Sequence, residues 1–283
     1  MESSGEKDTR PEIWLSAEPT DEELKEAFAE GLRYSFHRHS VCIYVEFWLD
    51  KEKKDKTKVD RRAFSGVLVD INDQWLVVTA GHCIDLVQRQ LAWGCEFKRC
   101  YLIDSKDNAR LPVAFNWKDC DPWYQFDEKS GADYGALFIG GNTRDLMAAE
   151  EKAPMRIGTY EPDHTHFFAI YGWPGFAAQN MEEKMNMTSY TVFVRRTAMP
   201  DDLVNEPTVE TFFGHKLDSG ADFSGLSGAP LFACSKDFPL DPDSEYYLYA
   251  IQVWQRGREI GAPLARGFLP LLEQEVARRR RGA

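Results

Sequence analysis

The chain has 283 residues, of which 43% are hydrophobic and 13% aromatic, and its formal net charge is −12 at pH 7. This composition is typical of a folded globular protein with a sizeable core and excludes a disordered chain. The excess of acidic over basic residues argues against nucleic acid as a partner. No apolar run reaches the roughly 20 residues that span a bilayer, and the charged N-terminus lacks the apolar segment of a secretion signal. We therefore expect a cytoplasmic protein that binds neither membranes nor nucleic acid.

The N-terminal part of the sequence predicts a single helix after about 18 polar residues. Thr20 and Glu23 form a capping-box pattern, in which a threonine is followed three residues later by glutamate. The apolar residues Leu24, Phe28 and Leu32 then recur at helical spacing. We expect a helix over about 21–34 that packs on the main body.

From residue 41 onward the sequence predicts mainly strands. Short β-branched and aromatic runs, separated by polar turns, cover residues 41–48, 64–69, 75–79, 98–103, 111–116, 135–139, 164–171, 190–196, 208–213, 231–234 and 246–254. Helical periodicity returns only briefly after His82 and again over 269–277. Many short strands with few helices indicate an all-β sandwich or a pair of barrels.

A stretch rich in glycine, acidic residues and proline, 140–163, divides these strands into two groups of similar size. It predicts an N-terminal extension (1–39), a first half (40–150) and a second half that ends in a helix (151–283). Four arginines, 278–281, follow at the negative end of that last helix, where the helix dipole favours cations. A nucleic-acid-binding tail is the other interpretation of these arginines.

Six cysteines occur in the chain, and none forms a Cys-x-x-Cys pair. The nearest two, Cys95 and Cys100, are too isolated to indicate a zinc site. The small number and the wide spacing of the cysteines predict reduced thiols, as in a cytoplasm, and no bound metal.

A loop of small residues, 220–230, carries the first candidate catalytic residue. Ser227 is followed by Gly228 and preceded by Gly225 two positions earlier, and the apolar run 231–233 comes directly after the loop. Glycines let the backbone turn tightly and direct amide groups at an oxygen that gains negative charge. Such a loop suits a nucleophilic serine, but taken alone it could equally be a surface turn.

A nucleophilic serine needs a base and a group that orients this base. Among the six histidines, His82 alone follows an apolar strand (75–79) through a turn of two small residues; the others, His37, His39, His164, His166 and His215, have the contexts of surface or strand-edge residues. Asp133 stands at the start of the apolar strand 135–139, where a carboxylate needs a partner. A histidine N–H would serve, although Asp133 could also cap the strand only.

Three motifs resemble those of the trypsin-like (chymotrypsin-fold) serine peptidases. Residues 79–83, Thr-Ala-Gly-His-Cys, are similar to the family's Thr-Ala-Ala-His-Cys, and 133–137, Asp-Tyr-Gly-Ala-Leu, resemble its Asp-x-Ala-Leu. Residues 225–230, Gly-Leu-Ser-Gly-Ala-Pro, resemble its Gly-Asp-Ser-Gly-Gly-Pro. The order His, Asp, Ser and the separations of 51 and 94 residues also suit this family. The resemblance covers about 40–277, and the turn at 170–175 is like that of bacterial members, so we expect a bacterial-type intracellular member.

The resemblance implies an all-β fold of two six-stranded antiparallel β-barrels with an N-terminal and a C-terminal helix. Ser227 would attack the scissile carbonyl, His82 would take its proton and pass it to the leaving amine, and Asp133 would orient the imidazole. The amides of Gly225 and Ser227 would form the oxyanion hole. The chain would then be a serine endopeptidase that acts on protein or peptide substrates through an acyl-enzyme, with no cofactor or metal.

The resemblance also implies the substrate-binding residues, which are Ala221, Asp222, Val253, Trp254 and Gln255. Ala221 stands at the position of the pocket base, which favours an uncharged or small apolar side chain before the cut, unless Asp222 turns inward to bind a basic one. Two alternatives remain open. The first is a catalytically latent or silent binding module of the same fold, and the second is an esterase or other acyl transferase with the same triad.

One departure from the family concerns activation. Leu226 stands where zymogen-activated members have an aspartate that pairs with a newly cut N-terminus. We therefore expect no activation by N-terminal cleavage. A regulatory protein partner that orders the loop 218–226 is the control that we expect instead.

Overall fold

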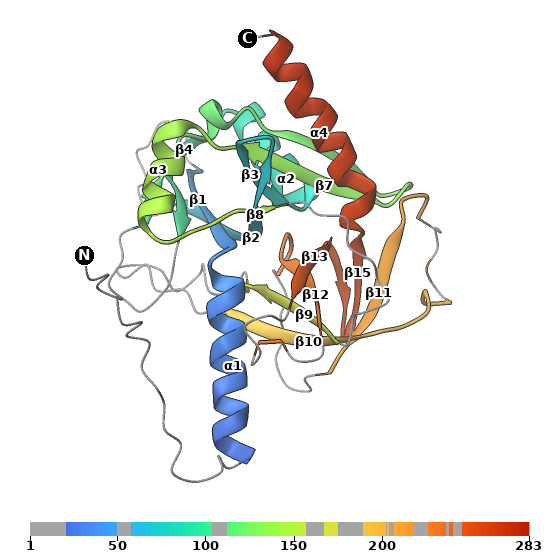
Figure 1. The fold of residues 1–283 in the computed structure, drawn as a ribbon. Coiled ribbons are helices and arrows are strands. Elements are labelled where there is room, and N and C mark those ends of the chain that lie inside the picture. Colours follow the sequence, from blue (N-terminus) through green and yellow to red (C-terminus); the bar gives the residue numbers. More distant parts are fainter. Residues whose placement is uncertain are drawn as a thin grey trace, which may run out of the picture.

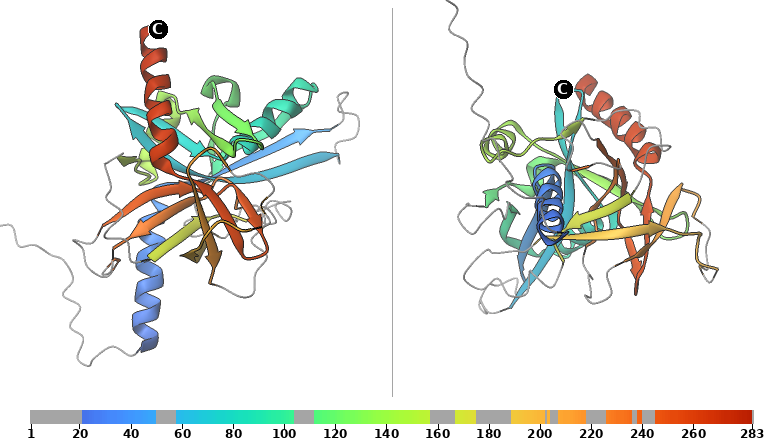
Figure 2. Two further views of the ribbon diagram at one scale, coloured as in Figure 1. Left: turned by 90° about the vertical axis from the view of Figure 1, so that its right-hand side faces the viewer. Right: turned by 60° about the horizontal axis from the view of Figure 1, so that its bottom comes forward.

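The structure, a computed structural model, describes residues 21–49, 58–103, 112–156, 167–174, 189–201, 203, 207–217, 226–235, 238–239 and 245–282, with only the backbone of 21–27. The chain forms two antiparallel sheets between a first helix, α1 (Asp21–His37), and a last helix, α4 (Ala265–Gly282). The free ends of these two helices project from opposite sides of the molecule (Figures 1 and 2). Within the described parts of the chain, every helix is too short or too polar to cross a membrane.

The first sheet has the strand order β5-β4-β1-β2-β3-β7-β6, and β8 pairs with β2 in parallel. Its strands are β1 (Ser40–Trp48), β2 (Val59–Ile71), β3 (Gln74–Thr79), β4 (Glu96–Ile103), β5 (Val113–Ala114), β6 (Trp123–Asp127), β7 (Ala132–Phe138) and β8 (Met155–Arg156). Three helical segments belong to this half, α2 (Gly81–Ala92), the 3-10 helix η1 (Trp117–Cys120) and α3 (Gly141–Ala149). The β-branched and aromatic side chains of β1 and β2 form its core together with α2.

The second sheet has the order β13-β12-β9-β10-β11-β15-β14. Its strands are β9 (Phe167–Gly172), β10 (Tyr190–Arg196), β11 (Thr211–Lys216), β12 (Pro230–Cys234), β13 (Tyr246–Ile251), β14 (Trp254–Arg256) and β15 (Glu259–Pro263). The helix α1 packs on this half through Leu32 and Phe36, and the Phe36 ring stacks on Phe232 with 4.3 Å between centroids.

The predicted class is confirmed, since the protein is mostly β, has two antiparallel halves and carries a helix at each end. The number of strands differs from the expected six in each half, because the first sheet has eight and the second seven. The additional strands are short or partly exposed, as in β6, or contain glycine and proline, as in β15, so they lack the alternation that identifies a strand. The division of the chain at residue 150 stays a prediction.

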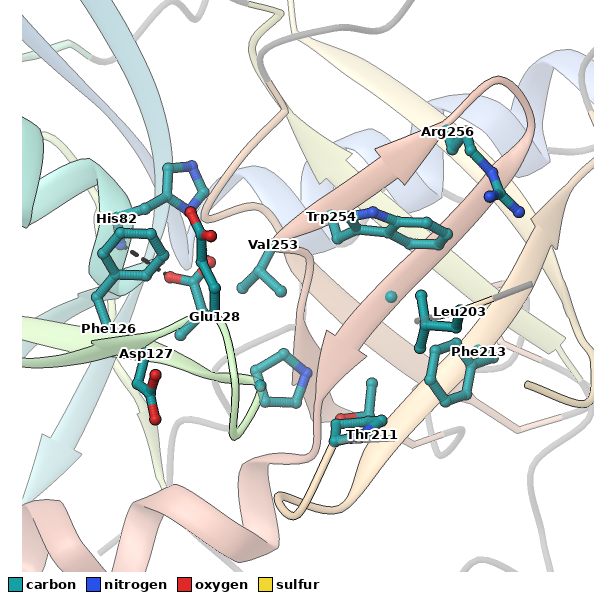
Figure 3. A pocket seen from close by; sticks show the side chains of 15 residues that line it. His82, Phe126, Asp127, Glu128, Leu203, Thr211, Phe213, Val253, Trp254 and Arg256 are labelled. Atoms are coloured by element: carbon teal, nitrogen blue, oxygen red, sulfur yellow. Dashed lines mark hydrogen bonds and ion pairs between the residues drawn. The ribbon is translucent and has the colours of Figure 1, made fainter. Parts of the chain in front are cut away.

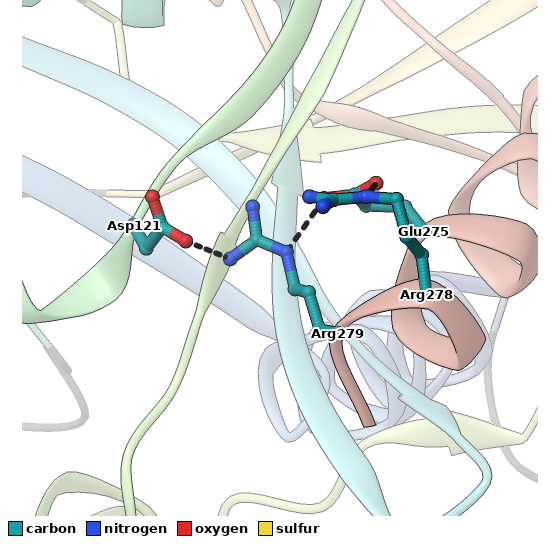
Figure 4. A network of polar contacts seen from close by, with 4 residues as sticks. All are labelled: Asp121, Glu275, Arg278 and Arg279. Carbon is teal, nitrogen blue, oxygen red and sulfur yellow. Dashed lines mark hydrogen bonds and ion pairs between the residues drawn. The ribbon is translucent and has the colours of Figure 1, made fainter. Parts of the chain in front are cut away.

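The last helix joins the second sheet to the first. Its apolar face, with Phe268, Leu272 and Val276, lies in a core that also contains strand residues of the first sheet. Near its end, Arg279 donates to Asp121 at 2.6 Å and to Glu275 at 2.7 Å (Figure 4). Hydrogen bonds from Arg278 and Arg279 lower the pKa of Glu275 to about 2, against the effect of its burial. Arg279 therefore joins α4 to the first half, as does Arg280, which donates to the carbonyl oxygen of Asn72, whereas the bonds of Arg278 to Glu275 stay within the helix.

Candidate functional site

The first two candidate catalytic residues, His82 and Asp133, lie on neighbouring elements. His82 is the second residue of α2, directly after β3, and Asp133 is in β7, which pairs with β3. The turn between β3 and α2 passes close to the backbone of β6 and β7, because a Cβ atom on Gly81 would lie 2.1 Å from the carbonyl oxygen of Gln125. A glycine is needed there to bring the histidine to the strand that carries the aspartate.

Asp133 holds His82 with both of its carboxylate oxygens. Oδ2 lies 2.7 Å from Nδ1 of the imidazole, and Oδ1 accepts from the backbone amide of His82 at 2.8 Å. A carboxylate partner places the ring proton on Nδ1, so that Nε2 of the neutral ring carries no proton and is the atom that accepts one. Burial is the largest single influence on the pKa of His82 and lowers it, but the interactions with Asp133 and Cys83 together outweigh burial, and the pKa is raised above its ordinary value.

The thiol of Cys83 lies next to this pair, 3.5 Å from Nε2 of His82. Burial raises the pKa of Cys83, so the sulfur stays a neutral thiol. Because its side chain is also only 1% exposed, it is not accessible as a nucleophile.

Ser227 lies in the tight turn that leads into β12, and contacts from both sheets hold this turn. The Ser65 amide of β2 donates to the carbonyl oxygen of Ser227 at 3.0 Å, and the Gly228 amide donates to that of Gln252 at 2.8 Å. Gly228 has φ +85°, and a Cβ atom on it would lie 2.0 Å from Oγ1 of Thr79. Thr79 is the last residue of β3, three positions before His82, so the serine turn contacts the strand that leads to the histidine.

The structure therefore pairs His82 and Asp133 directly, and it places the turn that carries Ser227 against Ser65 and Thr79, three residues before His82. Among the contacts of the described residues, no hydrogen bond joins the hydroxyl of Ser227 to His82. The Ser227 amide likewise donates to no acceptor in this part of the chain. Gly225, expected as the second oxyanion donor, lies outside the described residues.

A cavity of about 710 Å³ opens beside His82 and Asp133 between the two sheets (Figure 3). Phe126 and Glu128 line it from the hairpin of β6 and β7, and the aromatic rings of Phe213 and Trp254 line the side formed by the second sheet. The cavity is thus largely apolar, with acidic side chains on the side of the first sheet.

Of the residues expected to bind substrate, Val253 and Trp254 line this cavity. Gln255 does not, and its side-chain amide donates to the carbonyl oxygen of Gly257 at 3.3 Å. Ala221 and Asp222 lie outside the described residues. No three His, Cys, Asp or Glu side chains of the described segments lie close enough together to hold a metal ion.

Ser65 is a site residue that sequence reasoning missed. It is fully buried in β2, its amide holds Ser227, and its Oγ accepts from the amide of Trp173 at 2.9 Å. A hydroxyl inside an apolar strand needs a partner when it is buried. The interruption of the run 64–69 by this one polar side chain was the signal available in the sequence.

The sequence matches no family model and no curated protein. Among solved structures, the thermostable serine protease AL20 from an extremophilic microorganism matches with 13% identity over 84% of this chain and 97% of that chain, with a TM-score of 0.47. The scabies mite inactivated protease paralogue S-I1 matches with 12% identity over 84% and 94%, with a TM-score of 0.48. The protease Anisep from Arthrobacter nicotinovorans matches with 15% identity over 80% and 90%, with a TM-score of 0.46. These identities are too low to indicate which residues of this chain are catalytic.

Proposed function

We propose that this protein is a serine endopeptidase that uses His82, Asp133 and Ser227 as its catalytic triad. The observation that carries the proposal is the double hydrogen bond of Asp133 to the ring and the backbone amide of His82. A carboxylate that fixes the tautomer and the orientation of an imidazole is the arrangement that prepares a general base.

The reaction follows from the roles of these side chains. Nε2 of His82 takes the proton of the Ser227 hydroxyl while Oγ attacks the scissile carbonyl carbon. The C–N bond then breaks as His82 passes this proton to the leaving amine, and the acyl-enzyme forms. Water, activated by the same imidazole, hydrolyses the ester and regenerates the serine. The Ser227 amide, together with that of Gly225, stabilises the oxyanion in both halves of the reaction.

The cavity beside His82 supports a peptide as substrate. It is large enough for several side chains, and its apolar wall includes Val253 and Trp254. Because it adjoins the imidazole, residues on one side of the scissile bond would fill it. A protein or peptide with apolar residues near the cut is therefore the substrate class that we assign.

Labelling with a fluorophosphonate probe tests the function, since such probes react with an activated serine. We expect the wild type to be labelled and to cleave casein, and Ser227→Ala to do neither. His82→Ala should fold but lose labelling. Labelling that persists in Ser227→Ala would place the nucleophile elsewhere and overturn the triad.

A latent binding module is the second candidate, and the missing hydrogen bond between Ser227 and His82 favours it. In active enzymes this bond is often long without substrate and shortens in the reacting complex. Absence of labelling at every pH, and with a set of diverse peptides present, would favour the binding module, as would labelling that requires a regulatory protein partner.

A further inference from the structure

The residue before the proposed nucleophile is anchored in the core of the second half. Leu226 is only 1% exposed, and its side chain lies in the apolar cluster that includes Ile170, Val192 and Leu231. Ser227, the next residue, is partly exposed. Of these two consecutive residues of one turn, the first is thus buried in the core and the second is partly open to solvent.

The peptide group between Leu226 and Ser227 is also oriented by a hydrogen bond. The carbonyl oxygen of Leu226 accepts from the Ala229 amide at 2.8 Å, which closes the turn around Gly228. In a trans peptide the C=O and the N–H point in opposite directions. The bond that holds this carbonyl therefore directs the Ser227 amide away from the turn, where the described residues offer it no acceptor.

We propose that Leu226 is a positioning residue, whose buried side chain sets the Ser227 amide and hydroxyl for reaction. This inference rests on the proposed function. An apolar anchor needs no charged partner, because burial of the side chain alone stabilises the turn.

The test compares Leu226→Ala with Ile170→Ala. Both substitutions remove the same number of carbon atoms from one apolar cluster, and Ile170 is fully buried in β9. The loss of stability against urea should be comparable. Only Leu226→Ala should lower kcat, by about 10-fold to 100-fold because an oxyanion donor is displaced, with KM nearly unchanged. Leu226→Met, which keeps the anchor, should restore most of kcat.

Hydrogen exchange of the turn at 226–230 provides a readout that does not depend on activity. Exchange should become faster in Leu226→Ala and stay unchanged in Ile170→Ala and in Leu226→Met. Equal kcat and equal exchange in the two alanine variants would overturn the inference, because Leu226 would then contribute stability only. An inactive, unlabelled wild type in which Leu226→Ala still speeds exchange would overturn the proposed function and leave Leu226 as the anchor of the turn. If Leu226→Ala does not fold, Leu226→Val against Ile170→Val gives the same comparison with a smaller change.

Discussion

The carboxylate of Asp133 binds His82 twice, at Nδ1 with 2.7 Å and at the backbone amide with 2.8 Å. The second bond holds the start of α2, and the first holds the ring, so one side chain positions both the helix and its imidazole. A residue that only caps the strand β7 would not reach the ring. Among the candidate catalytic residues, His82 and Asp133 are therefore the two whose relative position is fixed by direct hydrogen bonds.

Asp133→Asn should lower kcat by about 10⁴-fold, because the amide favours the wrong tautomer of His82. Asp145→Asn, an exposed change on α3, is the control and should leave kcat unchanged. Activity of Asp133→Asn within tenfold of wild type, measured on a peptide substrate, would contradict the assigned role.

The pH dependence of activity should follow His82. Burial lowers its pKa, but Asp133 and Cys83 together raise it above the ordinary value. Only the neutral imidazole accepts a proton, so activity of the wild type should rise as pH increases through this raised pKa. In Asp133→Asn the residual activity should rise at a lower pH.

The stability of the fold should also depend on His82. The stabilising effect of a raised histidine pKa is complete below the unfolded value of about 6.5 and is lost as pH rises through the folded value. The stability difference between the two proteins, from urea unfolding, should thus shrink with increasing pH.

Gly228→Ala should prevent the serine turn from closing. A Cβ atom there would lie 2.0 Å from Thr79 Oγ1 and 2.1 Å from the carbonyl oxygen of Ser65, and φ is +85°. The left-handed backbone conformation alone should cost an alanine at this position about 1–2 kcal/mol of stability. The close contacts of its Cβ atom with Thr79 and Ser65 add to this cost. The control is Gly267→Ala in α4, where a Cβ atom meets nothing within 4 Å and alanine favours the helix. Thermal unfolding and probe labelling of both variants provide the measurement. Equal melting temperatures and equal labelling of the two variants would show that the serine turn does not require glycine at position 228.

Ser65→Ala should destabilise the contact between the two halves of the protein, because Ser65 in β2 binds Trp173 of the second half. It removes the oxygen that accepts from the Trp173 amide at 2.9 Å and leaves a buried donor without that partner. The expected loss in the free energy of unfolding is about 1–3 kcal/mol. Ser235→Ala serves as the comparison, because Ser235 directly follows β12 and its Oγ also accepts from a backbone amide, that of Glu245, but in an exposed position. An unchanged urea midpoint in Ser65→Ala would mean that water replaces the hydroxyl.

Glu275→Gln should reduce the sensitivity of the fold to acid. The pKa of Glu275 is lowered from 4.5 to about 2 by Arg278 and Arg279, so its carboxylate stabilises the fold above pH 4.5, and this stabilisation is lost as pH falls through about 2. The free energy of unfolding of the wild type should therefore fall more steeply over this window than that of the variant. Parallel pH curves from urea unfolding would show that the network at the end of α4 contributes nothing.

Local patterns in the sequence predicted most of the regular structure. The apolar run 75–79 became β3, the pattern after residue 20 became α1, and the start of a helix after His82 became α2. Elements without a clear pattern were missed, such as α3, which begins with glycine in a stretch interpreted as a linker, and β6, whose residues are mostly half-exposed. Periodicity identifies an element only when one face of it is consistently buried.

The sequence by itself determined the residue types of the site, because a serine between glycines, a histidine after an apolar strand and an aspartate before another can be recognised one at a time. Only the tertiary structure decided that Asp133 meets His82 across 51 residues, since the pairing of β7 with β3 sets that distance. The same holds for Ser65 and Leu226, whose roles depend on a strand and a core that lie far away in the chain. Local propensity acts within a few residues, whereas register and packing are properties of the whole fold.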